Sequence, residues 1–133
     1  LFPYTTLFRS SLSCAQIADT LATAAIVVFT GSGASARRAA RERPRVPVLV
    51  LTPSPTTARR LALQWGVHAV HTKDIGSFEE MVAKGKRMAL RHGFGGAGAK
   101  LIMLAGVPFG TPGSTNLLHV VTLRGDELTR HSS

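Results

Sequence analysis

The sequence predicts an α/β fold of three layers, with helices on both faces of a five-stranded, mixed and mostly parallel sheet. Short apolar runs, rich in Val, Ile and Leu, alternate along the chain with segments of helical periodicity. Such alternation is typical of right-handed βαβ crossovers, which make neighbouring strands parallel. Residues 106–116 are too few to hold a crossover helix, so we expect the last strand to be antiparallel and to lie at an edge.

The predicted elements are bounded by residues that begin or end them. An apolar stripe at helical spacing indicates the first helix, and Ser35 is the expected N-cap of the second, which Pro44 ends. Gly66 ends the third helix, where we expect Trp65 to be packed. Ser77 caps the fourth helix, whose acidic residues come first and basic residues last, as the helix dipole favours. The predicted helices are 12–22, 35–43, 57–65 and 77–91, and the predicted strands are 24–29, 46–51, 67–71, 101–105 and 117–123.

The length of 133 residues predicts one domain. We interpret residues 1–10 as a non-native segment, because they resemble the translation of a widely used sequencing adapter, and we leave them out of the predicted fold. Residues 11–123 form the predicted α/β domain, and residues 124–133 form a polar tail. The single cysteine, Cys14, excludes an internal disulfide and fits a reducing, cytoplasmic location.

The formal net charge of +9 raises the question of a nucleic-acid partner. Aromatic residues make up only 6% of the chain, too few for base-stacking platforms, and the arginines are spread along the predicted helices. We therefore interpret the charge as a solvated helix surface and expect no nucleic acid. The apolar runs are much shorter than the roughly 18 residues that cross a bilayer, so we expect no membrane partner.

A loop of small and hydroxyl residues follows the first predicted strand: Thr30, Gly31, Ser32, Gly33, Ala34 and Ser35. The loop leads directly into a helix, whose N-terminal amides and dipole favour an anion. Backbone amides and hydroxyls together predict a phosphate-binding nest, and an ordinary tight turn is the alternative. The loop also fits a loose dinucleotide fingerprint, but the second predicted strand ends without the acidic residue that would hold a ribose.

A second loop of the same character follows the fourth predicted strand: Gly110, Thr111, Pro112, Gly113, Ser114 and Thr115. In an open parallel sheet, the loops after the first and fourth strands flank one crevice. Neither loop carries a carboxylate, a histidine or a cysteine, so we expect a site that binds a small phosphorylated ligand without reacting with it. We expect no catalytic residue and no metal site, and we give no such role to the histidines at 68, 71, 92 and 119.

Several short motifs in unbroken order resemble one known family over residues 17–121. They are the strand and loop at 25–37, Arg43-Pro44-x-x-Pro47, Leu51-Thr52-Pro53, Thr57-Ala58-Arg59-x-Leu61, Trp65-Gly66-Val67 and Gly113-Ser114-Thr115-Asn116. Together they resemble the C-terminal domain of pyruvate kinase. In that family the domain follows a catalytic barrel that transfers a phosphoryl group between phosphoenolpyruvate and ADP, in glycolysis, with Mg²⁺ and K⁺. The barrel has no counterpart in this chain, so we expect no cofactor here and no activity from the chain alone.

The resemblance implies a regulatory role. It implies that the loop at 30–35 binds the phosphate of a sugar-phosphate effector, that the loop at 110–115 closes over it, and that the domain helps to form a homotetramer. Relatives activated by fructose 1,6-bisphosphate use basic residues near Met81 and in place of Gly31 or Ala34. The residues here favour a monophosphate instead, either a hexose or pentose phosphate or a nucleotide monophosphate such as AMP. The alternatives are an effector site that has lost its function and a free-standing phosphometabolite-binding module without a kinase.

Overall fold

The computed structural model describes residues 5–8, 17–19, 21–41, 44–73, 75–107 and 115–124. Its strands are β1 (Thr5–Phe8), β2 (Ala25–Phe29), β3 (Val48–Thr52), β4 (Val67–His71), β5 (Lys100–Val107) and β6 (Thr115–Thr122). Its helices are α2 (Ala34–Arg41), α3 (Pro55–Leu61) and α4 (Phe78–Arg91), and residues 17–19 are helical as well. None of the helices in these ranges is both long and apolar enough to span a membrane.

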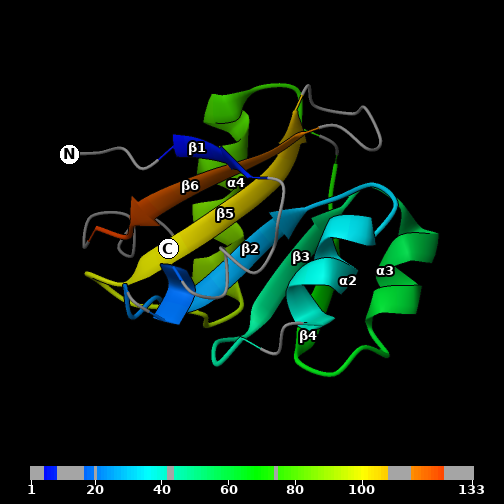
Figure 1. Cartoon of the computed structure of the whole chain (residues 1–133), viewed down its shortest axis with the longest axis horizontal. Coiled ribbons are helices and arrows are strands. Elements are labelled where there is room, and N and C mark those ends of the chain that lie inside the picture. Colours follow the sequence, from blue (N-terminus) through cyan, green and yellow to red (C-terminus); the bar gives the residue numbers. More distant parts are fainter. Residues whose placement is uncertain are drawn as a thin grey trace.

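The strands form one sheet in the order β1-β6-β5-β2-β3-β4 (Figure 1). Strands β2, β3, β4 and β5 are parallel, and β6 runs antiparallel to β5. These five strands confirm the predicted mixed sheet with an antiparallel last strand. The expected edge position of that strand is wrong, because β1 pairs with the other side of β6. Strand β2 lies near the centre, and Phe29 at its end is level with Ala105 of β5 and Leu51 of β3. The carboxyl ends of the parallel strands therefore share one edge of the sheet.

A sixth strand comes from the segment that the sequence analysis left out of the fold. Strand β1 pairs antiparallel with β6, with Thr5 opposite His119 and Phe8 opposite Asn116. Without it, β6 would be an edge strand whose unpaired N–H and C=O groups can accept any extended segment, whatever its origin. The origin of residues 1–10 as a translated adapter stays a prediction.

Two apolar clusters, one on each face of the sheet, make up the core. Successive strand residues point to opposite faces, so Val27 belongs to one cluster and Ile26 to the other. The first cluster lies under α4 and includes Met81, Met88 and Ala89. The second lies under α2 and α3 and includes Ala36, Ala39 and Leu61. Helices thus cover both faces, and the predicted three layers are confirmed, with α2 and α3 in front of the sheet and α4 behind it in Figure 1.

The long helix fits the prediction closely. Ser77 is its N-cap, and the Ser77 side chain accepts a hydrogen bond from the backbone N–H of Glu80 at 3.2 Å. A Cβ atom added at Gly85 would lie 2.6 Å from Cε of Met103. The glycine therefore allows α4 to come close to β5.

The other helix boundaries differ from the prediction. Helix α2 begins at Ala34, so Ser35 lies in its first turn and the assignment of Ser35 as N-cap is wrong. Helix α3 is 55–61 rather than 57–65, because Ser54 caps it and Pro55 occupies its first turn. The predicted helix 12–22 lies partly outside the described residues, and the chain has already turned at Ala22, whose φ is 52°.

Trp65 was expected to be a packed helix end, and that expectation is wrong. The helix stops at Leu61, and Trp65 lies in the following turn with 83% of its surface exposed. Leu63, in the same turn, is 90% exposed. Gly66 does adopt a positive φ of 78°, but it ends this turn rather than a helix.

Candidate functional site

The loop after β2 is closed by its own hydroxyl groups. The Gly33 N–H donates to Thr30 Oγ1 at 2.9 Å, and the Ala34 N–H donates to Ser32 Oγ at 3.3 Å. The Thr30 N–H donates to the carbonyl of Leu51 at 3.1 Å, which ties the loop to β3. The loop residues therefore hold a defined turn that leads into α2.

Glycine is required at position 33. Its φ is +90°, a conformation that residues with a side chain rarely adopt. A Cβ atom there would also lie 3.0 Å from Nη1 of Arg37 and 3.2 Å from Cγ2 of Thr57. Gly31 differs, because a Cβ atom added there would meet nothing within 4 Å.

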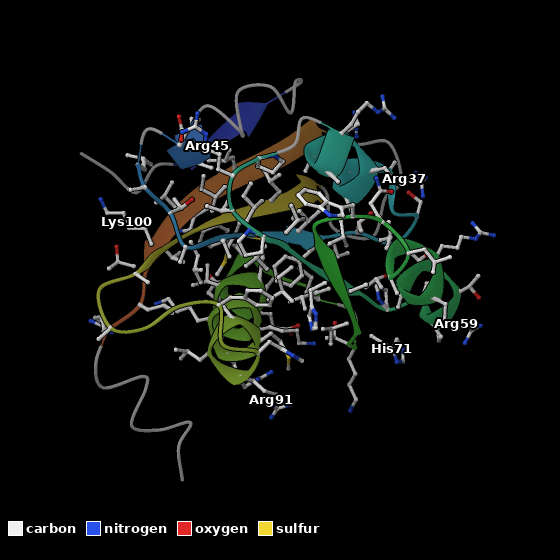
Figure 2. The ribbon with its side chains drawn as sticks, turned by 90° about the horizontal axis from the view of Figure 1, so that it is seen from below. Arg37, Arg45, Arg59, His71, Arg91 and Lys100 are labelled. Carbon is white, nitrogen blue, oxygen red and sulfur yellow. The ribbon has the colours of Figure 1, made fainter. Side chains whose placement is uncertain are left out.

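Two residues outside the predicted site complete its surroundings. The hydroxyl of Thr57, on α3, donates to the carbonyl of Gly31 at 2.8 Å. The guanidinium of Arg37 lies beside Gly33, and Arg37 is exposed on α2 (Figure 2). Sequence reasoning missed both residues. The position of Thr57 could have been inferred from Ser54 and Pro55, which are typical of a helix start. A helix that starts there directly after β3 places Thr57 near the end of β2 as well.

The exposed atoms of the loop suit an anion. Gly31, Ser32 and Ala34 are exposed, whereas Gly33 is buried. The Ser32 hydroxyl accepts the Ala34 N–H and keeps its own proton as a donor. The loop therefore exposes the Ser32 hydroxyl, and the positively charged guanidinium of Arg37 lies beside Gly33 of the same loop.

The second predicted loop, Gly110 to Thr115, lies almost entirely outside the described residues. Only Thr115 is described, as the first residue of β6, where its backbone is level with Val107 of β5. Strand β5 lies next to β2 and runs parallel to it. The strands that precede the two predicted loops, β2 and β5, therefore end at the same end of the sheet. Whether they close on one ligand stays a prediction.

The histidines make separate local contacts. His68 Nε2 lies 3.3 Å from His92 Nδ1, and His71 Nε2 lies 3.1 Å from the carbonyl oxygen of Pro53. Burial lowers the pKa of His92, and the neighbouring His68 and Arg91 lower it further. The described residues contain no group of three His, Cys, Asp or Glu side chains that could hold a metal ion.

We expect His119 to make the stability of the fold depend on pH. It is buried in β6, its ring meets the edge of Phe78 at 4.8 Å between centroids, and burial followed by the charge of Lys86 lowers its pKa below 6.5. A lowered pKa means that the unfolded chain binds the proton more readily. We expect the contribution of His119 to the free energy of unfolding to stay constant above pH 6.5. It should fall as the pH drops below 6.5 toward the lowered pKa of His119.

The measurement is urea unfolding, followed by circular dichroism, between pH 7.5 and about pH 5. The variant His119→Gln should show a weaker decrease with acid than the wild type. His71→Gln, at an exposed position, is the matched control and should keep the wild-type profile. An unchanged acid dependence in His119→Gln would contradict the assignment.

Comparisons with known proteins agree on one family. The family model described as "Pyruvate kinase, alpha/beta domain" matches residues 10–121. A pyruvate kinase of Methylorubrum extorquens is 39% identical over 115 residues, which are 86% of this chain and 24% of that protein. Pyruvate kinases of Agrobacterium vitis and Clostridium acetobutylicum are 39% and 38% identical over 108 residues, 81% of this chain and 23% of each. The chain thus spans about a quarter of the length of these relatives.

Proposed function

The chain belongs to the pyruvate kinase family, in which it corresponds to the alpha/beta domain, and we propose that it binds a phosphorylated effector at the loop of residues 30–35. The effector would be bound and released unchanged. Its binding would favour one arrangement of the subunits over another, which is a coupling free energy between this loop and a distant catalytic centre. The domain acts in this proposal as the regulatory and assembly part of a larger enzyme.

The observation that supports this proposal most is the combination of loop and cation at the start of α2. The Ser32 hydroxyl has a free proton to donate, and the guanidinium of Arg37 lies beside Gly33. A phosphate carries the charge that both groups favour, and arginine binds phosphate through paired N–H donors. The helix dipole of α2 adds to the same preference.

A monophosphate fits better than a bisphosphate. Met81 is completely buried in the cluster under α4, so it offers neither charge nor a hydrogen bond to a second phosphate. Gly31 and Ala34 are exposed but have no polar side chain. A hexose or pentose phosphate, or a nucleotide monophosphate such as AMP, is the proposed ligand class.

The rest of the proposed enzyme follows from the family. The whole protein would transfer a phosphoryl group between phosphoenolpyruvate and ADP in glycolysis, in the cytoplasm and as a homotetramer. A catalytic barrel outside these residues would bind the Mg²⁺ and K⁺ and carry the reacting groups. The loops described here would bind the effector and carry out no step of the transfer.

The loop is tested by removing its hydroxyls. We expect the double variant Ser32→Ala/Ser35→Ala to bind glucose 6-phosphate or AMP more weakly, because a hydrogen bond to a charged group contributes about 1.5–3 kcal/mol. Isothermal titration calorimetry measures the affinity. Thr122→Ala removes an exposed hydroxyl at the other end of the sheet, where Thr122 pairs with Lys100, and is the control. An affinity of the double variant equal to that of the control would rule out the loop as the binding site.

A second experiment tests whether the chain alone catalyses the phosphoryl transfer. The purified chain should form no ATP from phosphoenolpyruvate and ADP in the presence of Mg²⁺ and K⁺, because the proposed site holds no acid, base or nucleophile. A coupled assay for pyruvate measures the turnover. Pyruvate formation above the background of a protein-free control would refute the proposal that the chemistry belongs to a separate barrel.

A further inference from the structure

A basic groove lies between the edge strand β4 and helix α4. Its volume is about 460 Å³. Val70 and Met88 give it apolar walls, and its other described lining residues are His71, Thr72, Lys73, Lys84, Arg87, Arg91 and His92. Strand β4 is the last strand of the sheet, so its outer side faces the groove rather than another strand. His71 and Arg91 mark this side of the molecule in Figure 2.

The described lining of the groove is positively charged. Four of the lining residues that the structure describes are lysine or arginine, and none of these described residues is acidic. Within the described ranges, no carboxylate forms an ion pair with Lys73, Arg87 or Arg91. Like charges that line one groove repel one another, and a bound anion would relieve that repulsion.

The walls of the groove are held in place. The ammonium group of Lys84 donates a hydrogen bond to the carbonyl of Lys73 at 2.8 Å, which joins α4 to the segment after β4. An ammonium group has further protons to donate into the groove. Lys84, Arg87 and Arg91 are spaced by three and four residues on α4, so they lie along one face of the helix.

We propose that this groove binds a small polyanion, a molecule with two or more phosphate or carboxylate groups. The volume is in the range of small-molecule sites, which are about 300–1,000 Å³. Two guanidinium groups can each bind an oxyanion through paired N–H donors, and the lysines add charge. The site differs from the loop at 30–35, because α4 covers the face of the sheet opposite to α2 and α3.

The test is a titration of the ¹⁵N-labelled 133-residue chain with inorganic pyrophosphate, and separately with citrate, followed by NMR. We expect saturable shifts of the Thr72, Lys73, Arg87 and Arg91 signals. Saturation by pyrophosphate alone assigns a phosphate ligand, and saturation by citrate alone assigns a carboxylate ligand; either outcome supports the site. Shifts confined to residues 31–35 would overturn it, as would shifts that never saturate.

Two double variants that remove the same charge distinguish a specific site from general electrostatic attraction of the anion to the chain. We expect Arg87→Gln/Arg91→Gln to lower the affinity for the polyanion by about tenfold or more. Arg41→Gln/Arg60→Gln, at exposed positions in the last turns of α2 and α3, removes the same charge and should leave the affinity within about twofold. Equal losses in the two double variants would overturn the proposal. The single variant Arg91→Gln, also exposed, provides the same comparison if the double variant does not fold.

Discussion

Replacement of Met81 by lysine is expected to lower the free energy of unfolding by about 3–5 kcal/mol, the usual cost of an uncompensated buried charge. Met81 has no exposed surface and packs in the cluster under α4. A lysine there must either lose its hydration or give up its charge, and both are unfavourable. Domains of this size are stable by only about 5–15 kcal/mol, so the variant should unfold at much lower urea.

Met81→Leu is the matched control, because it conserves volume and apolar character and should cost less than about 1.5 kcal/mol. Both variants are compared with the wild type by urea unfolding and circular dichroism. Wild-type stability in Met81→Lys would contradict the burial of Met81 described here. The preference for a monophosphate would be wrong if the wild-type chain bound fructose 1,6-bisphosphate more tightly than glucose 6-phosphate.

Replacement of Gly33 by alanine is expected to disturb both the stability and the ligand affinity of the effector loop. An alanine at φ +90° is strained by about 1–3 kcal/mol. Its Cβ atom would also displace the Arg37 guanidinium or the Thr57 side chain, which lie within 3.2 Å of that position. We therefore expect Gly33→Ala to be destabilised and to bind glucose 6-phosphate or AMP at least about tenfold more weakly.

Gly31→Ala is the control for this change, two residues earlier in the same loop. Its Cβ atom would enter open space, so stability and affinity should stay close to the wild type. Urea unfolding gives the first quantity and calorimetry the second. Equal behaviour of the two alanine variants would show that the loop does not need the backbone conformation described here.

The sheet could be predicted well from the sequence, for a clear physical reason. Buried parallel strands are short, nearly continuous apolar runs. The runs 25–29 and 48–52 have this pattern, and both are buried along their whole length. The antiparallel last strand followed from the short connection before it. Helix ends were harder, because the choice between Ser54 and Thr57 as the start of α3 depends on which hydroxyl meets a free amide.

Only those residues of the candidate site that are contiguous in the sequence could be predicted. Residues 30–35 are contiguous, so their small and hydroxyl character is visible in the sequence. Thr57 contacts Gly31, which lies 26 positions earlier in the sequence, and no local sequence pattern predicts such a contact. The basic groove was missed for the same reason. The spacing of Lys84, Arg87 and Arg91 and the strand at 67–71 could both be read from the sequence, but their position on either side of one groove could not.

The exposed position of Trp65 has a practical consequence for spectroscopy. It is the sole tryptophan of the chain, and its indole is already in contact with water in the folded state. Its emission should therefore change little on denaturation, and fluorescence would understate the loss of the core. The same indole would shift to shorter wavelength if another polypeptide covered the turn between α3 and β4, which makes it a built-in reporter of docking at that corner.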